Sequence, residues 1–600
     1  MNMIGKKSSR WKIIDQSYFV LFLTFSLMDL TNVGAGLVDG LVISHYLDAE
    51  SMAAAGIAHP IFSIAGIFGG MFAVGMQTLC TRELGRGDVK AFNRLFSAVM
   101  ILGTAFSLVL MAAQLVWAEP FAALMGASKK GAALAPLAAA YLRGVGIGLP
   151  ALIMTSVLTS AIQMDSGRNR VLIGAIACFV LDILLDFAAV FLHMGLFGVG
   201  LATALAKYLE AAYLLLHFRK KDKMLRFVPL ETNVKEILNV LSCGYEKVLR
   251  RLANVLRPIL LNKQIIFYGG ALAMTAMSVQ NSVSNFTQLF SAGLADSLVL
   301  MVGIFFGEMN DEAIRETAHC NHRNCLIFCG GVCVLLLIFA EPVAGFYVSG
   351  NEELLRMTAF TMRIVAIDTP LSALLRSRIA YLQAIGRTRN MQLLSAAVSL
   401  FYVVFSAFLI GKLFGAYGIL ASFLVSDILA MLTVWLYYCI KTRKLLPSPE
   451  DQMNLPDDFH RSPGDVIYLD IRDEEDISLV AHQIDLFCKG HGIGEQTGYH
   501  AAVCFEELAS NIIAYGFPGC KLEPGIDFLL VFSENELILR IKDNCPPFDV
   551  ERQITLLVNE GKVDSEERIG LKILSRMAPN ISYVHTLETN NVILRFPIGD

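Results

Sequence analysis

The sequence predicts a mostly α-helical membrane protein of about twelve spans, arranged as two parallel six-helix repeats and followed by an α/β sandwich. Three observations carry this prediction. Hydrophobic residues make up 55% of the 600 positions, charged residues only 17%, and the mean hydropathy is +0.56, which excludes a soluble fold for most of the chain. Long apolar stretches recur along the chain, and part of their sequence repeats. The composition then turns polar after Lys444.

The apolar stretches extend from Tyr18 to Ile440, and each covers about 20 residues or more, the length that crosses a ~30 Å hydrocarbon core. Because no water satisfies the backbone inside that core, each stretch must be a helix. The predicted spans are residues 16–45, 52–80, 93–117, 134–162, 171–193, 197–217, 236–267, 271–304, 322–347, 358–384, 391–413 and 418–440.

The first six spans share a pattern with the last six. The matching residues are Arg143, Pro150 and Gly167-Arg-Asn-Arg170 in the first half and Arg363, Pro370 and Gly386-Arg-Thr-Arg389 in the second. We therefore expect two lobes, residues 1–220 and 221–445. Because six is even, both lobes enter the membrane in the same direction, as in transporters built from parallel repeats, with the substrate path between them.

Lysines and arginines concentrate in alternate loops, and both the N-terminus and the segment after Ile440 are basic. Basic loops stay on the cytoplasmic side of a membrane, so we expect both termini to be cytoplasmic. The net charge of −4 gives no reason to expect a nucleic acid as a partner.

Carboxylates interrupt the apolar sequence in the fifth span. Asp182 and Asp186 are four residues apart, so on a helix they lie on one face, one turn apart. A single carboxylate at the bilayer centre costs roughly 2.5–3.5 kcal/mol, so a pair should face a polar interior rather than lipid. A third acid, Asp39, lies in the first span. Two interpretations remain open: a polar cluster satisfied by neighbouring hydroxyl groups, or a cation site.

The membrane half resembles the multidrug and toxic compound extrusion (MATE) family over roughly residues 15–440. The matching motifs are Asp39-Gly, Ala53-Ala-Ala-Gly56-Ile-Ala-His-Pro60, Glu83-Leu-Gly85-Arg-Gly87-Asp88, the repeated Gly-Arg-x-Arg loops and Gly198-Val-Gly200-Leu-Ala-Thr203. The resemblance implies a cation site in the first lobe made of Asp39, Asp182, Asp186 and Thr203. The chain departs from the family at Asp182, where Asn is usual. Glu246 corresponds to an acid on the substrate path of some members.

The extra carboxylate at Asp182 bears on the coupling ion. Three acids this close cannot all be ionised in a medium of low dielectric constant unless a cation joins them. A cluster that holds a proton could couple transport to H⁺, and three carboxylates could equally hold Na⁺. Both ions serve as coupling ions in the family, and we favour protons.

A polar linker, residues 446–463, is expected to lead into a soluble domain of residues 464–600. Alternating and apolar runs predict strands at 465–471, 528–533, 537–542, 581–586 and 591–596. Helical periodicity covers 477–489 and 498–515. This order of elements favours an α/β sandwich.

The C-terminal domain resembles the GHKL ATPase fold, in particular the small anti-sigma-factor serine kinases. The first motif places Glu507, Asn511 and Tyr515 at i, i+4 and i+8 of one helix. The resemblance implies that Glu507 is a general base and that Asn511 binds Mg²⁺ through the nucleotide, and Tyr515 stands where His is frequent. In the second motif Asp543 would accept from the adenine amino group. In the third, Gly570 opens a helix whose N-terminus would meet phosphate.

Two further departures from the GHKL pattern argue against full kinase activity: Cys545 replaces a usual Gly, and Arg568 replaces the first Gly of the third motif. The domain is therefore expected to bind Mg-ATP, with weak or degenerate kinase activity as a further possibility. The alternative is an α/β domain that no longer binds nucleotide.

Together these features predict an antiporter of the bacterial inner membrane that exports bulky cationic organic molecules by alternating access. Energy would come from an ion gradient, because the chain has no GxxxxGK[ST] motif. The alternative is a signalling protein, in which the transporter-like half senses a ligand and the C-terminal domain binds or phosphorylates an anti-sigma-antagonist-like partner.

Overall fold

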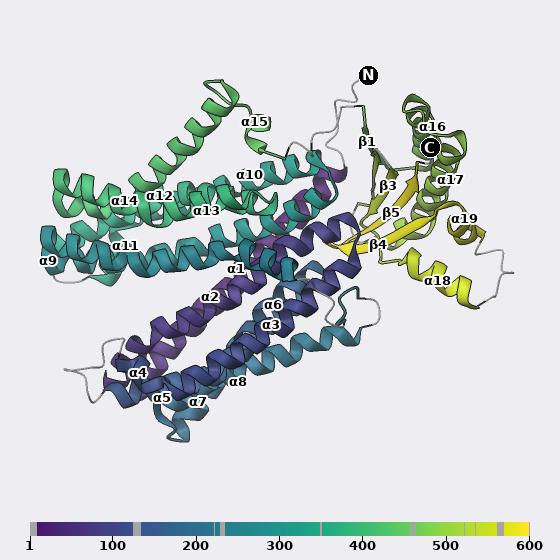
Figure 1. Cartoon of the computed structure of the whole chain (residues 1–600). Helices are drawn as coiled ribbons and strands as arrows, with labels where there is room; N and C mark the ends of the chain where they lie inside the picture. The colour runs from purple at the N-terminus through teal and green to yellow at the C-terminus, as the bar shows by residue number, and fades with distance from the viewer. Residues whose placement is uncertain are drawn as a thin grey trace.

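A computed structural model describes residues 9–47, 49–123, 134–220, 223–228, 234–348, 351–456, 459, 464–520, 523–533, 536–560 and 569–598. The chain forms a long helical bundle of two lobes with a small sheet domain at one end (Figure 1). We call this the sheet-side end of the bundle and the other the far end.

Over its described residues the first lobe contains six long helical segments, one of them a bent pair of helices. Its helices are α1 (Ser9–Tyr46), α2 (Ala49–Arg86), α3 (Val89–Val116), the short α4 (Ala118–Ala122), α5 (Leu134–Ile147), α6 (Leu149–Met164), α7 (Arg168–Phe191) and α8 (Gly195–Leu215). α5 and α6 meet at a bend of 43° next to Gly148 and Pro150. The missing N–H and fixed φ of proline suit it to the first turn of the new helix.

The second lobe repeats this plan with two helices that fold back. Its helices are α9 (Val234–Gly307), α10 (Asp311–Ile338), α11 (Ala340–Tyr347), α12 (Glu352–Ala384), α13 (Thr388–Ala396) and, after a π turn, α14 (Tyr402–Thr442). α9 breaks at Gly270 (φ 60°) and α14 at Gly415 (φ 61°), conformations that glycine adopts without steric cost. The Tyr402 hydroxyl lies 2.9 Å from that of Thr433, which a straight helix could not allow.

Both ends of α9 also reach the same half of α2. A Cβ on Gly75 would lie 2.1 Å from the Val240 carbonyl oxygen, and Gly307 lies against Arg82. α9 therefore provides two segments that run in opposite directions. Among the described residues, eight helices are long and apolar enough to cross a membrane, or nine if α5 and α6 form one span. α2 adds a tenth segment, and the reversals in α9 and α14 divide each of these two helices into two segments. Each of the twelve predicted spans therefore corresponds to a helical segment.

The internal repeat is visible in matched local contacts. Asp88 caps α3 by accepting from the Ala91 N–H at 2.8 Å, and Asn310 caps α10 by accepting from the Ala313 N–H at 2.9 Å. Each lobe also has one ion pair at a matching position: Arg143 with Glu119 at 3.0 Å in the first lobe, and Arg363 with Glu341 at 2.9 Å in the second. The same cap and the same ion pair in both lobes agree with the predicted duplication.

The two lobes meet at the sheet-side end and lie further apart at the far end (Figure 1). The contact is close because glycines line it: a Cβ on Gly244 would lie 2.0 Å from the Met71 carbonyl oxygen, and one on Gly85 would lie 2.1 Å from that of Ile304. The Arg82 guanidinium of α2 donates to the Gln383 and Ala384 carbonyl oxygens at the end of α12. The bundle is thus closed at the sheet-side end.

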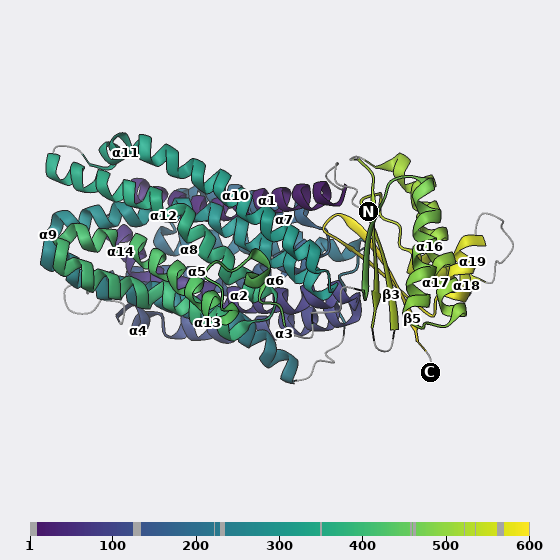
Figure 2. The ribbon, with the colours of Figure 1, turned by 90° about the horizontal axis from the view of Figure 1, so that it is seen from above.

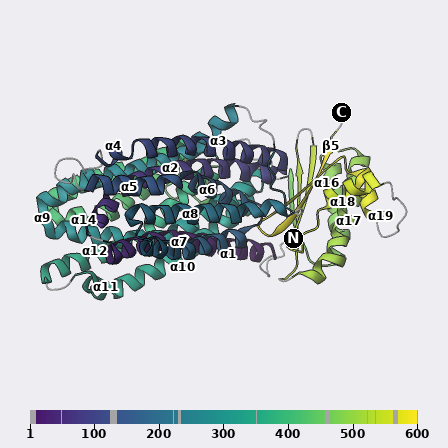
Figure 3. The same cartoon turned by 90° about the horizontal axis from the view of Figure 1, so that it is seen from below.

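The C-terminal domain is a two-layer α/β structure. Its five strands are β1 (Val466–Ile471), β2 (Ile526–Phe532), β3 (Glu536–Asp543), β4 (Asn580–Thr586) and β5 (Thr589–Pro597), in the order β1-β2-β3-β5-β4 with every neighbouring pair antiparallel. Four helices cover one face: α16 (Glu474–Gly490), α17 (Glu495–Asn511), α18 (Val550–Glu560) and α19 (Ile569–Met577). The other face lies against the bundle (Figures 2 and 3).

The segment expected to be a linker is docked on the bundle over its described part. It contains α15 (Pro449–Met453), where Ser448 and Asp451 form a reciprocal capping box. Arg387 then donates to the Leu455 carbonyl oxygen at 3.2 Å, and Phe459 stacks on Phe306 with ring centroids 5.2 Å apart. These contacts tie the C-terminal domain to the second lobe, so the segment is not a free tether.

Candidate functional sites

The three intramembrane acids converge in the first lobe. α1 supplies Asp39 and α7 supplies Asp182 and Asp186, and one carboxylate oxygen from each lies within 4.8 Å of the others. The spacing of four residues places the two α7 acids on one face, and the packing of α1 against α7 brings Asp39 to them. The structure therefore joins three residues that are separated by more than 140 positions in the sequence.

The α7 acids point into the protein, as expected from the cost of exposing them to lipid. Asp182 is 3% exposed and Asp186 is fully buried, whereas Ile176, Val180 and Leu184 are exposed on other faces of α7. One oxygen of Asp182 and both oxygens of Asp186 have no hydrogen-bond partner among the described residues. Neighbouring hydroxyl groups thus leave three buried oxygens unsatisfied, which disfavours a self-contained polar cluster.

Unsatisfied, converging carboxylate oxygens are a donor set for a hard cation or for shared protons. Na⁺ prefers oxygen ligands, and a proton on one carboxyl group could be shared with its neighbour. Thr203 of α8 lines the same cavity as Asp39 and Asp182, while its hydroxyl donates to the Val199 carbonyl oxygen at 3.4 Å. The residues present fit either coupling ion.

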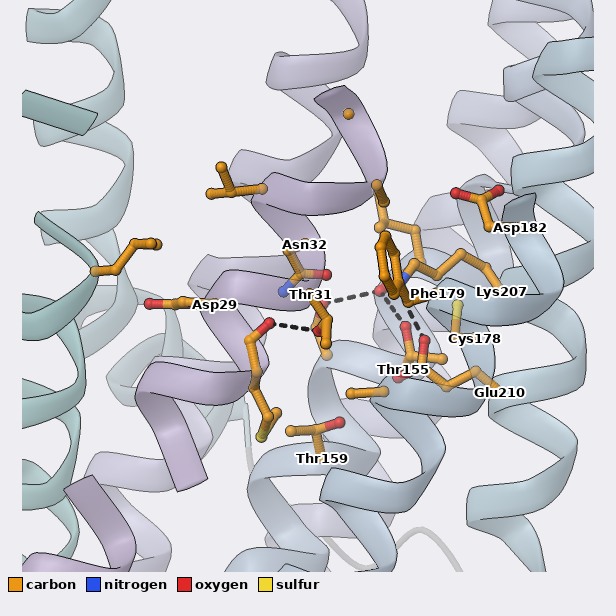
Figure 4. A pocket seen from close by; sticks show the side chains of 18 of the residues that line it. Asp29, Thr31, Asn32, Thr155, Thr159, Cys178, Phe179, Asp182, Lys207 and Glu210 are labelled. Carbon is orange, nitrogen blue, oxygen red and sulfur yellow. Dashed lines mark hydrogen bonds and ion pairs between the residues drawn. The ribbon is translucent and has the colours of Figure 1, made fainter. Parts of the chain in front are cut away.

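A cavity of about 620 Å³ lies beside the acids, between the two lobes. α1, α6, α7 and α8 of the first lobe form most of its wall, and α9 and α12 of the second lobe contribute Asn285, Gln288 and Arg376. Asp39 and Asp182 line it, whereas Asp186, one helical turn after Asp182, is not among the described residues that line it. Figure 4 shows Asp182 near Lys207, with Asp29 and Asn32 across the cavity.

Three further charged residues of the cavity wall, Lys207, Glu210 and Arg376, were not identified from the sequence. Lys207 and Glu210 form a largely buried ion pair of 2.8 Å on α8, and Arg376 reaches the cavity from α12. The spacing of three between a base and an acid in the sixth span was the available signal for the first two. Arg376 had no such signal, because only the tertiary fold brings α12 to the first lobe.

Two further acids lie where the sequence could not place them. Glu246 is buried in an ion pair with Arg250 at 3.2 Å and accepts from the Ser395 hydroxyl at 2.8 Å, and it is not part of the cavity wall. Asp29, ten residues before Asp39 on α1, lines the same cavity without joining the cluster of three acids. The cavity is long enough to span both positions.

Apart from the cavity between the lobes, the C-terminal domain has a pocket of about 370 Å³ between its sheet and its helices. All five residues of the predicted nucleotide site line it: Glu507, Asn511, Tyr515, Asp543 and Gly570. They come from α17, the turn after it, β3 and α19, so three separate motifs of the sequence meet in one place. Arg568 lies outside the described residues.

Close packing explains the glycine of the third motif. A Cβ on Gly570 would lie 1.7 Å from Glu507 Oε1, so any other residue would require the Glu507 side chain to leave its present position. Asn511 donates its amide N–H to Glu507 at 2.6 Å. Tyr515 departs from the predicted geometry: α17 ends at Asn511 and a π turn follows, which leaves Tyr515 81% exposed at the rim.

Asp543 lies at the bottom of the pocket. It accepts from the Asn590 amide N–H at 2.8 Å and from the Cys545 backbone N–H at 2.9 Å. Burial raises the pKa of the Asp543 carboxyl above its usual range, although these two hydrogen bonds oppose the shift. A buried acid with fixed acceptor geometry suits recognition of an amino group.

Comparison with known proteins identifies the membrane half. The MatE family model matches residues 25–188 and 249–409, more than half of the chain. The multidrug export protein MepA of Staphylococcus aureus (strain MSSA476) is 23% identical over 451 residues, covering 72% of this chain and 96% of MepA. The protein of the same name in Staphylococcus saprophyticus is 22% identical over 426 residues, covering 70% of this chain and 93% of its own length.

Solved structures show the same fold. An outward-facing multidrug resistance MATE transporter of the MOP superfamily superimposes with a TM-score of 0.66 at 18% identity, covering 73% of this chain and 99% of its own. A MOP superfamily transporter from Pyrococcus furiosus gives the same TM-score and identity over 74% and 99%. The twelve helical segments, the internal repeat and the matched family residues agree, and the chain is a multi-pass membrane protein that belongs to the MatE family.

Proposed function

We propose that this protein is a cation-coupled secondary exporter of organic molecules that works by alternating access. The observation that carries the proposal is the convergence of Asp39, Asp182 and Asp186, with buried unpaired oxygens, next to a cavity between the lobes. The relatives named as multidrug export proteins support the direction and the broad class of substrate.

The acids link ion binding to movement of the first lobe. Without a cation, repulsion between the α1 and α7 carboxylates opposes close packing of these helices. A bound H⁺ or Na⁺ removes the repulsion and lets α1 approach α7, which changes the cavity wall that Asp39 and Asp182 share. A substrate held there then leaves, because both ligands depend on the same carboxylates.

The lining supports a bulky substrate with a positive charge. Asp29, Asp39 and Asp182 supply negative charge, and Met28 and Phe179 supply apolar and aromatic surface. A cation over an aromatic face gains about 0.5–2 kcal/mol beyond burial. The ion pair between Lys207 and Glu210 is internally neutral, and Arg376 offsets only one of the three aspartates, so the described wall keeps a negative character.

We propose that the bundle spans the inner membrane of a bacterial cell, with its sheet-side end facing the cytoplasm. The arginines of both Gly-Arg-x-Arg motifs, and Arg82 and Arg86 of α2, lie at this end. Positively charged residues of membrane proteins concentrate on the cytoplasmic side. The relatives found in Staphylococcus support a bacterial cell membrane.

Transport in proteoliposomes under separate H⁺ and Na⁺ gradients tests the proposal. We expect the wild-type chain to export a fluorescent organic cation under at least one gradient, and the double variant Asp39→Asn with Asp186→Asn to lose the response to the gradient. Asp427→Asn is the control, since Asp427 is also a buried acid but lies in the second lobe, outside the acid cluster. Gradient-driven export by the double variant would refute the site.

We further infer that the C-terminal domain binds Mg-ATP as a regulatory ligand. Convergence of three sequence motifs on one pocket supports this, and Asn511 keeps an amide oxygen for the metal while its N–H is held by Glu507. Were phosphoryl transfer to occur, Glu507 is the candidate general base. Binding of a fluorescent ATP analogue to the full chain should require Mg²⁺ and fall at least tenfold in Asn511→Ala, the loss of about 1.4 kcal/mol. Equal binding by this variant would refute the pocket.

A further inference from the structure

The sheet of the C-terminal domain contacts the ends of both lobes at once. On its bundle-facing side, Lys542 of β3 donates to both oxygens of Glu308 at 2.7 and 2.9 Å, and Asn591 of β5 donates to Glu308 at 3.2 Å. Tyr468 of β1 donates to Asp311 at 2.7 Å. Glu308 lies in the turn between α9 and α10, and Asp311 is the first residue of α10, so both belong to the second lobe.

The same sheet holds the first lobe through β4 and β5. The Thr586 hydroxyl donates to the Met164 carbonyl oxygen at the end of α6 at 2.9 Å. Arg595 donates to the Arg86 carbonyl oxygen at the end of α2 at 2.7 Å, and Gly87, at φ +84°, packs on Ile593. A Cβ on Gly87 would lie 2.6 Å from the Ile593 side chain. A single rigid sheet therefore bridges two lobes that must separate at this end for the cavity to open there.

The ion pair between Lys542 and Glu308 is the most enclosed of the charged contacts. The Glu308 side chain is 2% exposed and that of Lys542 is 14% exposed. A charge buried this deeply depends on its partner, so removal of either side chain leaves the other uncompensated. Two donors on one carboxylate make Glu308 the central residue of the contact.

The bridge is joined to the nucleotide pocket by strand geometry. Successive residues of a strand point to opposite faces of a sheet. On β3, Lys542 faces Glu308 and the next residue, Asp543, faces the pocket; on β5, Asn591 faces Glu308 and Asn590 donates to Asp543. In the register of the sheet, Lys542 pairs with Asn591 and Asp543 with Asn590. A ligand that moves Asp543 or Asn590 moves the peptide units that carry the bridge.

We propose that the C-terminal domain is a clamp that holds the two lobes together at the sheet-side end, and that β3 and β5 couple this clamp to the occupancy of the pocket. The clamp comprises Glu308, Lys542, Asn591, Tyr468 with Asp311, Thr586 with Met164, and Arg595 with Arg86. The coupling rests on the proposed binding of Mg-ATP, whereas the clamp rests on the contacts alone.

Cys243 reports the opening of this end without any transport assay. It lies on α9, beside the glycine contact with α2, and is 6% exposed. Its modification by a membrane-impermeant maleimide is measured by mass spectrometry of the purified full-length chain. We expect Lys542→Glu and Glu308→Lys each to raise the rate about tenfold, within the usual range of coupling between sites. The double variant, with the charges exchanged, should return to the wild-type rate.

Lys489→Glu is the control, because Lys489 forms an exposed pair with Asp485 on α16, on the side of the sheet away from the bundle. It should label at the wild-type rate. Wild-type labelling in both single variants, or no rescue in the exchanged pair, overturns the clamp whether or not the protein transports. Mg-ATP should change labelling of the wild type but not of Asp543→Asn. If Mg-ATP binds in the separate assay and leaves wild-type labelling unchanged, the coupling is overturned while the proposed nucleotide site stands.

Discussion

Asp182 stands where the resemblance to the MATE family leads us to expect asparagine, and the structure places it on the wall of the cavity, one helical turn before Asp186. Asp182 lines the cavity together with Asp39, so a substrate in the cavity would meet its charge, whereas Asp186 is not among the lining residues. Asp182 thus has two roles to separate, in ion binding and in contact with the substrate.

We expect Asp182→Asn to keep gradient-driven export, since it restores the amide that the family usually has, and to weaken binding of a cationic substrate by removing one charge from the wall. The same assay in Asp186→Asn should show loss of coupling instead. Measuring KM and the maximal rate separately in proteoliposomes distinguishes weaker substrate binding from loss of coupling to the gradient. Loss of coupling in both variants would contradict the division of roles.

Asp543 supports a prediction about pH because its pKa is raised in the folded domain. The folded state therefore disfavours ionisation relative to the unfolded chain, so stability falls as the pH rises from the usual carboxyl pKa through the raised value. Asp543→Asn keeps both hydrogen-bond acceptances and removes the buried charge. We expect thermal unfolding of this domain within the full chain to become less dependent on pH and its midpoint at pH 7 to rise, while ATP binding weakens. A lower midpoint at pH 7 would contradict the assigned cost of burial.

At the scale of helices, the repeat offers a matched pair of caps. Asp88 and Asn310 occupy equivalent positions, and replacing such a cap by alanine costs about 0.5–2 kcal/mol. We expect Asn310→Ala to lower the free energy of unfolding more than Asp88→Ala does. Asn310 is 2% exposed, so its removal would leave the Ala313 N–H buried without this acceptor, whereas water can take the place of the exposed Asp88 side chain. Thermal unfolding in detergent measures both, and the opposite order would contradict the argument.

The approach of α19 to α17 provides another element-scale test. Gly570→Ala would drive a methyl group into Glu507, so we expect it to move α19 outward and to lower Mg-ATP binding several-fold. Gly490→Ala in α16 is the control, since an added Cβ there meets nothing within 4 Å. The fluorescent-nucleotide assay compares them, and equal affinity in both variants would mean that the pocket tolerates this shift.

At the scale of the whole molecule, the contact between lobes depends on small residues along α2 and α9. Gly75→Val would place a branched side chain against the Val240 carbonyl oxygen, so the closed arrangement should become less favourable and the modification of Cys243 faster. Gly66→Ala on the same helix meets nothing within 4 Å and should leave the rate unchanged. An unchanged rate in Gly75→Val would show that α2 and α9 yield without separating the lobes.

The sequence alone determined the membrane class, the twelve apolar segments and the duplication, because span length and the spacing of repeated loops are local or periodic properties. It also identified Asp39, Asp182 and Asp186, since the cost of a carboxylate in lipid makes each visible. The five strands were predicted to within a few residues, and the turn at Gly270 fell between two predicted spans. Five of the residues that line the C-terminal pocket were named from the resemblance of their motifs to the GHKL fold.

Only the tertiary structure decided which residues meet. Arg376 reaches the cavity, Glu246 is withdrawn into an ion pair, the linker docks through α15, and the sheet bridges both lobes at Glu308. Each of these depends on contacts between segments far apart in the chain, and no local pattern encodes such a contact. The spacing of Asp182 and Asp186 required a shared face, whereas the arrival of Asp39 beside them required the packing of α1 on α7.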